Sequence, residues 1–380
     1  MSKKQILFNE FHSISKLKQK IKEYSPTSVF LVTGKESYFD SGSETFIKKL
    51  LYGINYTRFS EFEKNPKEFD VKRGKILFNK HKCDFIIAIG GGSVIDMAKL
   101  INSSQAFNGS VRAMIEKNGN FNKPIKKLVA IPTTSGAGSE ATHFAVLYID
   151  NIKHSFSHLD FLLADYVFLY PKLTHSMNTY QTAISGLDAY CQSIESYWSV
   201  NSTNESKNYA SESINILTSN LFDAVIKNSL TAKNKISYAA YLAGKAINIS
   251  KTTGAHAMSY FLTSEFNIPH GHAVALTIAQ WFEFNVNTNF NKILDKRGLD
   301  YLNKTMTELS KLIKSKDLKS SKNTLETFIK SLGIETSLSK FGVENKDFKN
   351  IVKSVNLERL KNNPIKIEES QILNIVKNIY

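Results

Sequence analysis

Cysteine is almost absent from the chain. Only Cys83 and Cys191 occur among 380 residues, and they stand in unrelated contexts. Two isolated thiols supply neither a disulfide framework nor a CxxC redox pair. Small disulfide-linked folds and dithiol redox chemistry are therefore excluded.

Long apolar runs are missing as well. No segment approaches the ~18 consecutive apolar residues of a membrane span. The opening sequence MSKKQILFNEF is charged and lacks the apolar core of a signal peptide. We therefore expect a soluble, cytoplasmic protein with no membrane partner.

Acidic residues are outnumbered by basic ones. The chain has 49 lysines and arginines against 34 aspartates and glutamates, a formal net charge of +15. This excess raises the hypothesis of nucleic-acid binding, but the lysines are scattered. The densest cluster, at residues 314–323, has no interleaved aromatic rings on which bases could stack. We expect no nucleic-acid partner and a positive field that favours an anionic small substrate.

The hydrophobic fraction of 42% is that of a globular protein, and the length suits two domains. In the first 182 residues, strand-like and helix-like segments alternate, which indicates a parallel sheet covered by helices. The expected strands are 28–34, a run from Asp84, a run from Leu128 and a return strand at 165–171, and the expected helices include 13–24 and 71–82.

The pattern changes near residue 182, where apolar residues begin to recur at helical spacing and strand-like alternation disappears. The expected helices are 183–199, 205–227, 235–249, 273–284 and 302–314, and residues 314–324 are expected to form a polar surface loop. We therefore predict an α/β domain at 1–182 and an all-helical domain at 183–380.

Two donor-rich turns follow two of the predicted parallel strands. A glycine triplet precedes the helix that carries Asp96 and Lys99, and a hydroxyl-rich loop follows the next strand. Glycine lets the backbone approach a diphosphate, and a helix N-terminus offers free N–H groups. A tight turn without a ligand is the alternative. The candidate nucleotide-binding residues are Gly90, Gly91, Gly92, Ser93, Asp96, Thr133, Thr134, Ser139 and Lys153.

Histidines gather at 254–272, where three of the nine occur. We expect a helix from Ile247 through Phe261 that carries His256, and then a turn that carries His270, because proline and glycine interrupt regular structure there. Converging imidazoles suit zinc or iron. Ordinary packed or solvated histidines are the alternative.

A carboxylate is needed to complete such a site. The best candidate is Asp188, which lies four residues before Gln192 on one helical face. Alternatively, Asp188 is a helix-start residue that forms a capping box with Ser185.

Four motifs stand in order: the glycine triplet, PTTSGAGSEAT, GLDAYCQSIESYWS, and the segment from HAMSY to PHGHA. Together they resemble the iron-containing (group III) alcohol dehydrogenase family, and their amino-acid sequences are most similar to those of its phosphonoacetaldehyde reductases. The resemblance implies a dehydroquinate synthase-like fold, in which a dinucleotide-binding α/β domain precedes an all-helical domain that binds a metal and the substrate.

The resemblance implies metal ligation by Asp188, His256 and His270. Gln192 stands where the family has its first histidine ligand. Glycerol dehydrogenases of the same superfamily also lack this histidine and use zinc, so the divalent metal is either Fe²⁺ or Zn²⁺. Tyr260 occupies a position where many members carry a histidine near the substrate. It is either a proton donor or a packing residue, and His272 is a further candidate donor.

The cofactor implied by the family is a nicotinamide nucleotide. An acidic residue at the end of an early strand would bind the ribose 2′-OH of NADH, but the sequence has Gly34 at that position, with Lys35 and Ser37 in the turn after it. This favours NADPH or dual use, although NADH can still be accepted.

The resulting prediction is an aldehyde reductase that converts phosphonoacetaldehyde to 2-hydroxyethylphosphonate, and we expect a homodimer. Donors expected to bind the phosphonate are Lys245, Lys251, Thr252 and Thr253, whose lysines are otherwise solvated helix ends. The alternatives are a short-chain or polyol alcohol dehydrogenase, a dehydroquinate synthase-type lyase, and a non-catalytic nucleotide- or metal-binding homologue.

Overall fold

The computed structural model describes residues 4–9, 13–63, 65–117, 119–150, 152–287 and 292–380. The chain divides into two compact units, Met1–Met177 and Asn178–Tyr380. The predicted boundary at residue 182 lies inside the first helix of the second unit.

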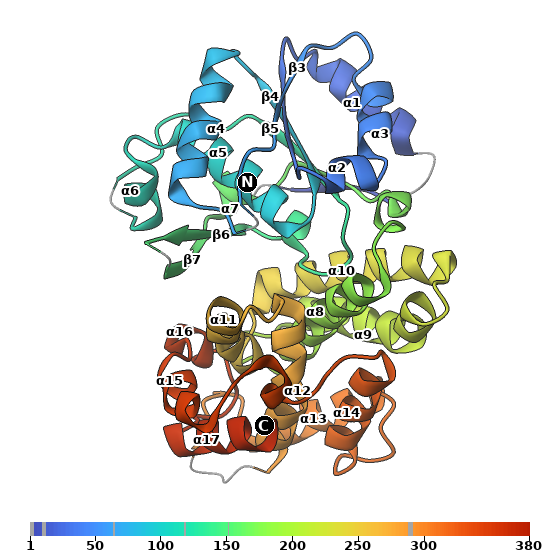
Figure 1. Ribbon diagram of the computed structural model, residues 1–380, viewed down its shortest axis with the longest axis vertical. Coiled ribbons are helices and arrows are strands. Elements are labelled where there is room, and N and C mark those ends of the chain that lie inside the picture. Colours follow the sequence, from blue (N-terminus) through green and yellow to red (C-terminus); the bar gives the residue numbers. More distant parts are fainter. Residues whose placement is uncertain (1–3, 10–12, 64, 118, 151, 288–291) are drawn as a thin grey trace. The chain divides into compact units, whose positions relative to one another are not determined.

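The first unit contains the predicted parallel sheet, whose six strands have the order β1-β8-β5-β4-β2-β3 (Figure 1). Every adjacent pair in this sheet is parallel. A separate antiparallel hairpin, β6–β7, was not predicted. The strands are β1 (Ile6–Phe8), β2 (Val29–Thr33), β3 (Tyr56–Phe59), β4 (Phe85–Gly90), β5 (Lys127–Pro132), β6 (Phe144–Ile149), β7 (Ile152–Ser157) and β8 (Tyr166–Phe168).

The central strands are apolar along their whole length because both faces of the sheet are buried. Phe30 and Val32 of β2 belong to the core beneath α4 and α5, whereas Val29 and Leu31 point to the opposite core, beneath α1 and α3. The helices are α1 (Ser13–Tyr24), α2 (Ser37–Asp40), α3 (Ser43–Leu50), α4 (Glu68–Lys80), α5 (Gly92–Ala106), α6 (Val111–Ile115) and α7 (Leu159–Leu162).

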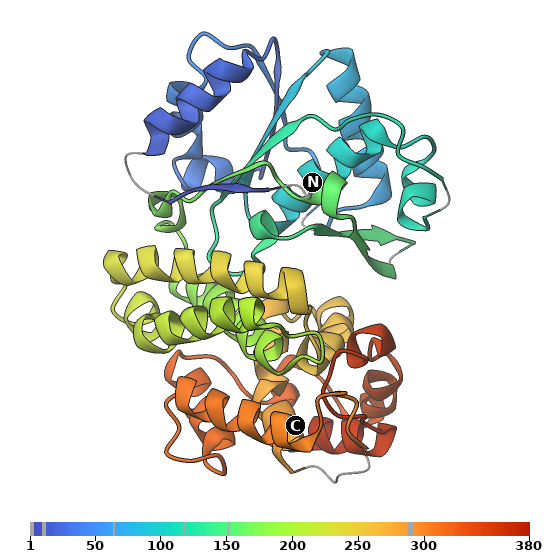
Figure 2. The ribbon, with the colours of Figure 1, turned by 180° about the vertical axis from the view of Figure 1, so that it is seen from behind.

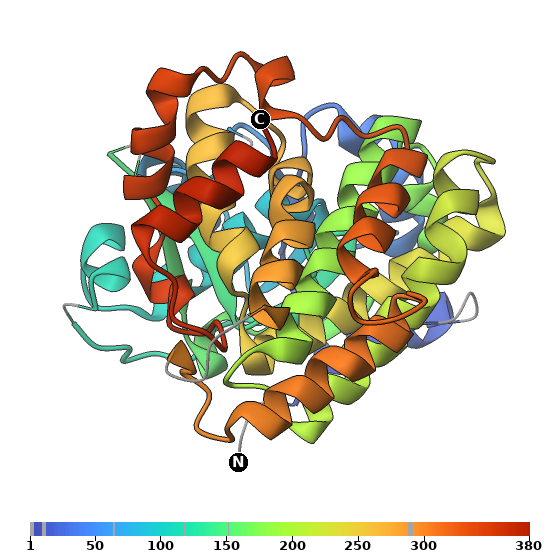
Figure 3. The same cartoon turned by 90° about the horizontal axis from the view of Figure 1, so that it is seen from below.

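The second unit is helical, as predicted, and is organised around α8, which contacts α9, α10 and α12 (Figures 2 and 3). Over the described residues, none of its helices combines the length and apolar character needed to cross a bilayer. The helices are α8 (Thr179–Trp198), α9 (Asn204–Val225), α10 (Leu230–Ser250), α11 (Gly254–Phe266), α12 (His270–Val286), α13 (Leu299–Leu312), α14 (Ser321–Ser331), α15 (Phe348–Lys353), α16 (Leu357–Leu360) and α17 (Glu369–Asn378).

The single helix predicted from Ile247 through Phe261 is wrong. The chain leaves α10 at Ser250 and re-enters a helix at Gly254. Lys251 adopts a left-handed φ of 64°, which stops the helical hydrogen-bond ladder. The break gives α11 a free N-terminus of its own.

Two further local predictions need correction. His270 does not lie in a turn but is the first residue of α12, which begins after Pro269. The polar loop expected at 314–324 is shorter, because α14 begins at Ser321. The reason is that Leu325 and Ile329 are buried at helical spacing, which draws this segment onto the core.

Candidate functional site

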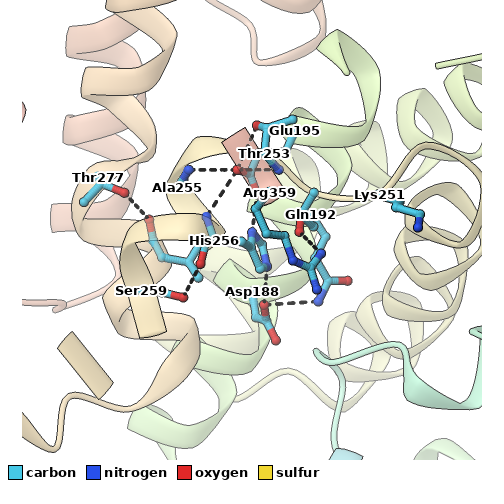
Figure 4. Close-up of polar contacts among 12 residues, drawn as sticks. Asp188, Gln192, Glu195, Lys251, Thr253, Ala255, His256, Ser259, Thr277 and Arg359 are labelled. Carbon is cyan, nitrogen blue, oxygen red and sulfur yellow. Dashed lines mark hydrogen bonds and ion pairs between the residues drawn. The ribbon is translucent and has the colours of Figure 1, made fainter. Parts of the chain in front are cut away.

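A buried cluster in the second unit brings together one carboxylate and two imidazoles. One ligand atom each from Asp188, His256 and His270 lies within 4.8 Å of the other two. The three residues come from α8, α11 and α12 (Figure 4 shows the first two with their neighbours). The predicted ligand set thus assembles from residues up to 82 positions apart in sequence.

Close packing of α12 against α8 brings His270 to this cluster. A Cβ atom at Gly271 would collide with the carbonyl oxygen of Ile184 and lie 3.0 Å from the Cβ of Asp188. Only glycine leaves room for this approach. His270 Nδ1 also lies 3.3 Å from Ser259 Oγ on α11, so the ring is placed by both of its neighbouring helices.

Glu195, on α8, fixes the start of α11, the helix that carries His256. Its side chain is fully buried, and its Oε1 accepts hydrogen bonds from Thr253 N at 3.2 Å, Ala255 N at 2.9 Å and His256 N at 3.3 Å. Thr253 Oγ1 donates to the same oxygen at 2.9 Å. A carboxylate here satisfies the unpaired N–H groups at the start of α11 and complements the positive end of its dipole.

The second oxygen of Glu195 contacts His256 Nδ1. This contact fixes the ring orientation, so that Nε2 faces the cluster at 3.4 Å from Asp188 Oδ1. Glu195 was not predicted from the sequence. The available signal was its spacing of seven residues from Asp188, which places the two carboxylates on one face of a helix.

The ionisation of the cluster follows from its charges. Burial by itself would lower the pKa of His256, but the neighbouring carboxylates of Glu195 and Asp188 outweigh burial and raise it. Burial by itself would raise the pKa of Asp188, but the imidazole of His256 at 3.4 Å and the charge of His270 hold it below its usual range. The carboxylates therefore favour the protonated form of His256, and the imidazoles favour the ionised form of Asp188.

The residues fit a divalent metal. His256 Nε2 is buried and has no hydrogen-bond partner among the described residues, although it faces two other ligand-type groups. One carboxylate and two imidazoles are a donor set suited to zinc or iron, and a carboxylate behind a ligating histidine is the usual support. Gln192 is also buried here, and its Nε2 donates to Asp188 Oδ1 at 3.1 Å.

The two predicted proton donors have different surroundings. The Tyr260 ring is half-buried, with its centroid 6.4 Å from that of His270. His272 is buried, with Nδ1 at 2.9 Å from Tyr180 Oη and Nε2 at 2.7 Å from the carbonyl oxygen of Glu335. Burial lowers the pKa of His272. Both of its nitrogens thus have protein partners in this arrangement.

The two predicted nucleotide-binding loops of the first unit lie against each other. The N–H of Thr133 donates to the carbonyl oxygen of Gly90 at 3.0 Å. A Cβ at Gly92 would lie 2.9 Å from that of Ala137 and 3.2 Å from Ser139 Oγ, so glycine permits the contact. Thr134 contacts the same turn less tightly, because its Cγ2 would lie 3.4 Å from a Cβ at Gly91. The sheet topology therefore brings these loops together as expected.

Asp96 and Lys99 on α5 bind the protein's own backbone. Asp96 Oδ2 accepts from Val146 N at 2.9 Å, and burial raises the pKa of Asp96 although Lys99 opposes the shift. Lys99 Nζ donates to the carbonyl oxygens of Thr142 at 2.8 Å and Phe144 at 3.0 Å. Both side chains tie α5 to the start of β6. Lys153 lies on β7 of the same hairpin.

The turn after β2 has a cation beside it that was not predicted from the sequence. Arg58, on the neighbouring strand β3, donates from Nη2 to the carbonyl oxygen of Gly34 at 2.9 Å, and its Cζ lies 4.5 Å from the ring centroid of Tyr38. Lys35 forms an exposed ion pair with Glu61 at 3.1 Å, and Ser37 begins α2. The cofactor-selecting turn thus has an arginine beside it.

Comparison with known proteins agrees with both units. The family model described as iron-containing alcohol dehydrogenase matches residues 4–171, and the model of the C-terminal part of the Fe-containing alcohol dehydrogenase family matches residues 182–380. The chain belongs to the iron-containing alcohol dehydrogenase family. This confirms the predicted family, fold and class of enzyme, an oxidoreductase acting on CH–OH groups.

Relatives within the family differ in substrate. Long-chain-alcohol dehydrogenase 1 of Geobacillus thermodenitrificans is 31% identical over 296 residues, which cover 77% of this chain and 73% of that protein. The phosphonoacetaldehyde reductase of Streptomyces viridochromogenes is 30% identical over 241 residues, 60% of each chain. A crystal structure of an iron-containing alcohol dehydrogenase, 28% identical, superimposes with a TM-score of 0.85 over 100% of this chain and 98% of that one.

Proposed function

We propose that this family member is a metal-dependent, NAD(P)H-linked aldehyde reductase that converts phosphonoacetaldehyde to 2-hydroxyethylphosphonate. The observation that carries the metal-dependent reduction is the buried cluster of Asp188, His256 and His270. The choice of substrate is supported by the amino-acid sequences of the four motifs and by the similarity to the phosphonoacetaldehyde reductase of Streptomyces viridochromogenes. A short-chain or polyol alcohol dehydrogenase is the competing function, supported by the diversity of the relatives.

Asp188, His256 and His270 would hold Fe²⁺ or Zn²⁺. When bound, such an ion acts as a Lewis acid that polarises the aldehyde oxygen and stabilises the negative charge that hydride transfer creates. Glu195 keeps His256 Nε2 directed at the site, and Gln192 orients the carboxylate of Asp188 through its hydrogen bond.

The alcohol product needs one proton, and we propose that Tyr260 Oη donates it or relays it from water. The position of this ring beside His270 supports that role. His272 was the second predicted donor. Because its nitrogens already contact Tyr180 and Glu335, we propose that it positions these segments and does not reach substrate.

The nicotinamide cofactor is proposed to bind the first unit. Gly90, Gly91, Gly92 and Ser93 would hold the diphosphate at the start of α5, beside the hydroxyl-rich loop with Thr133, Thr134 and Ser139. Gly34 at the position where an acidic residue would bind the ribose 2′-OH, together with Arg58 beside it, supports a preference for NADPH. A homodimer and a cytoplasmic location stay predictions.

The deciding experiment compares substrates on metal-loaded protein. Protein purified without chelator is loaded separately with Fe²⁺ or Zn²⁺, and oxidation of NADPH and NADH is followed with phosphonoacetaldehyde and with propanal. We expect turnover that prefers the phosphonate and disappears in His270→Ala but persists in His81→Ala, because His81 is an exposed histidine at the end of α4.

Turnover of propanal alone would keep the dehydrogenase and reject the phosphonate substrate. Cofactor binding without turnover of either aldehyde, under both metals, would contradict the proposed reductase and favour a non-catalytic homologue.

A further inference from the structure

Three of the four donors expected to bind a phosphonate near the metal cluster are exposed or contact other side chains. Lys245 Nζ lies 5.5 Å from the ring centroid of Tyr209 on α9. Lys251 is exposed and points away from Asp188 and His256 in Figure 4. Thr253 Oγ1 is bound by Glu195 and by Trp198 Nε1, at 2.9 and 2.8 Å. An anionic substrate would therefore need a different cation.

The short helix α16 supplies one. Its N-cap residue, Asn356, donates from its backbone N to the carbonyl oxygen of Ala257 at 3.3 Å, one residue after the candidate ligand His256. Asn356 Oδ1 in turn accepts from the backbone N of Arg359 at 3.0 Å. This cap therefore anchors Arg359 next to the helix that carries the ligand.

The side chain of Arg359 extends from this anchor toward the metal cluster. Its Nη1 donates to Thr252 Oγ1 at 2.6 Å, and its Cζ lies 5.9 Å from the ring centroid of Tyr260. Tyr260 itself is the neighbour of His270. In Figure 4 the guanidinium points toward the group formed by Asp188, Gln192 and His256.

Arg359 differs from most of the other arginines because it has no carboxylate partner in the described part of the chain. Three of the chain's five arginines, Arg73, Arg112 and Arg297, pair with carboxylates. Arg359 is half-buried and forms no ion pair within the described part of the chain. Thr252 accepts only one of its five N–H groups, so most of the planar fork is left to bind a ligand.

We infer that Arg359 binds the anionic group of the substrate and so selects short aldehydes that carry a phosphonate. This inference rests on the proposed function and extends it to a specificity-determining residue. A guanidinium matches a phosphonate in geometry, because two parallel N–H groups can bind two oxygens. If the aldehyde oxygen is held at the cluster of Asp188, His256 and His270, the opposite end of a short substrate would face the guanidinium of Arg359.

The test uses Arg359→Gln and Arg359→Lys in the metal-loaded enzyme. We expect kcat/KM of Arg359→Gln for phosphonoacetaldehyde to fall about 10- to 100-fold more than kcat/KM for propanal, because a hydrogen-bonded charge is lost. Arg359→Lys keeps the charge without the fork, and its loss should be intermediate. The inhibition constant of methylphosphonate, an anion without an aldehyde, should rise in the same order.

Two further variants serve as controls. Lys361→Gln removes a nearby positive charge that is exposed and paired with Glu358, so it should change the ratio of the two kcat/KM values less than threefold. Thr252→Val removes the anchor of the guanidinium but not its charge, and it should lower the preference for the phosphonate. This variant tests the inference if Arg359→Gln does not fold.

The outcomes separate the two claims. An equal loss for both aldehydes in Arg359→Gln, in an enzyme that still prefers phosphonoacetaldehyde, would overturn the role of Arg359 and leave the proposed function intact. A wild-type enzyme without that preference would overturn the proposed function. In that case, methylphosphonate that inhibits the wild type and inhibits Arg359→Gln more weakly would still support an anion site at Arg359. No inhibition of the wild type by methylphosphonate would overturn that site.

Discussion

Both carboxylate oxygens of Glu195 contact His256. Oε1 accepts from the backbone N of His256 at 3.3 Å, and Oε2 contacts the ring Nδ1. One buried carboxylate therefore caps α11 and orients a candidate metal ligand. Such outer partners set the orientation and basicity of a ligating imidazole. Helix start and metal site are coupled through this side chain.

Replacing Glu195 by Gln should weaken metal binding. The amide preserves the shape but loses the charge, so we expect the affinity for Zn²⁺ to fall about 10- to 100-fold. Competition with a chromophoric chelator measures this without reference to activity. Glu212→Gln, at an exposed position of α9, is the matched control. Unchanged affinity in Glu195→Gln would mean that Glu195 is only a helix cap.

Gly271→Ala should damage fold and site together. The added methyl group would meet the carbonyl oxygen of Ile184, so α12 must move away from α8 and take His270 with it. Overpacking of this kind costs about 1–3 kcal/mol. Thermal unfolding with and without Zn²⁺ is the measurement, and stabilisation by Zn²⁺ should shrink.

A suitable comparison for that variant is Gly53→Ala. Gly53 has a positive φ of 79° but no atom within 4 Å of an added Cβ. We expect a loss of stability from the backbone conformation alone, with stabilisation by Zn²⁺ retained. Equal responses to Zn²⁺ in the two variants would contradict a role of Gly271 in the metal cluster.

Arg58→Gln should shift cofactor use toward NADH. If the guanidinium beside Gly34 binds the 2′-phosphate, its removal lowers kcat/KM for NADPH by about tenfold or more, because a hydrogen bond to a charged group is lost. The value for NADH should change much less. Arg73→Gln, on α4 and paired with Asp70, is the control. An unchanged ratio would assign Arg58 to the support of the turn alone.

Local patterns were sufficient to predict which residues come together at the candidate site. The candidate ligands Asp188, His256 and His270 stand in recognisable motifs, and the loops after β4 and β5 meet because parallel strands end at one edge of a sheet. What the sequence did not reveal depends on long-range contacts. Glu195 is 61 residues from His256, and Arg359 is 107 residues from Thr252.

The helix break at residues 251–253 was missed for a similar reason. None of residues 251–253 is proline or glycine, and Lys251 itself adopts a positive φ of 64°. That conformation is costly for lysine and persists only where the surroundings enforce it. Here Glu195 draws the N–H groups of Thr253 and Ala255 to itself, and a residue on a different helix thereby decides where α11 begins.

The stability of the first unit should depend on pH through Glu140, in the loop after β5. Burial raises the pKa of Glu140 to about 7 from an ordinary value of 4.5, although Lys99 opposes the shift. The folded chain therefore keeps a proton that the unfolded chain releases near pH 4.5. Stability falls as pH rises between these two values and levels off above about 7.

Glu140→Gln should remove this contribution, because an amide does not ionise. At pH 8 the variant should be more stable than the wild type, by on the order of 3 kcal/mol at most, and the difference should vanish near pH 4.5. Melting temperatures at pH 5 and pH 8 measure the effect. Asp160→Asn, at an exposed carboxylate, should leave the pH dependence unchanged. Parallel pH profiles of wild type and Glu140→Gln would contradict the prediction, because they would mean that Glu140 is already ionised in the folded chain and stabilised by the charge of Lys99.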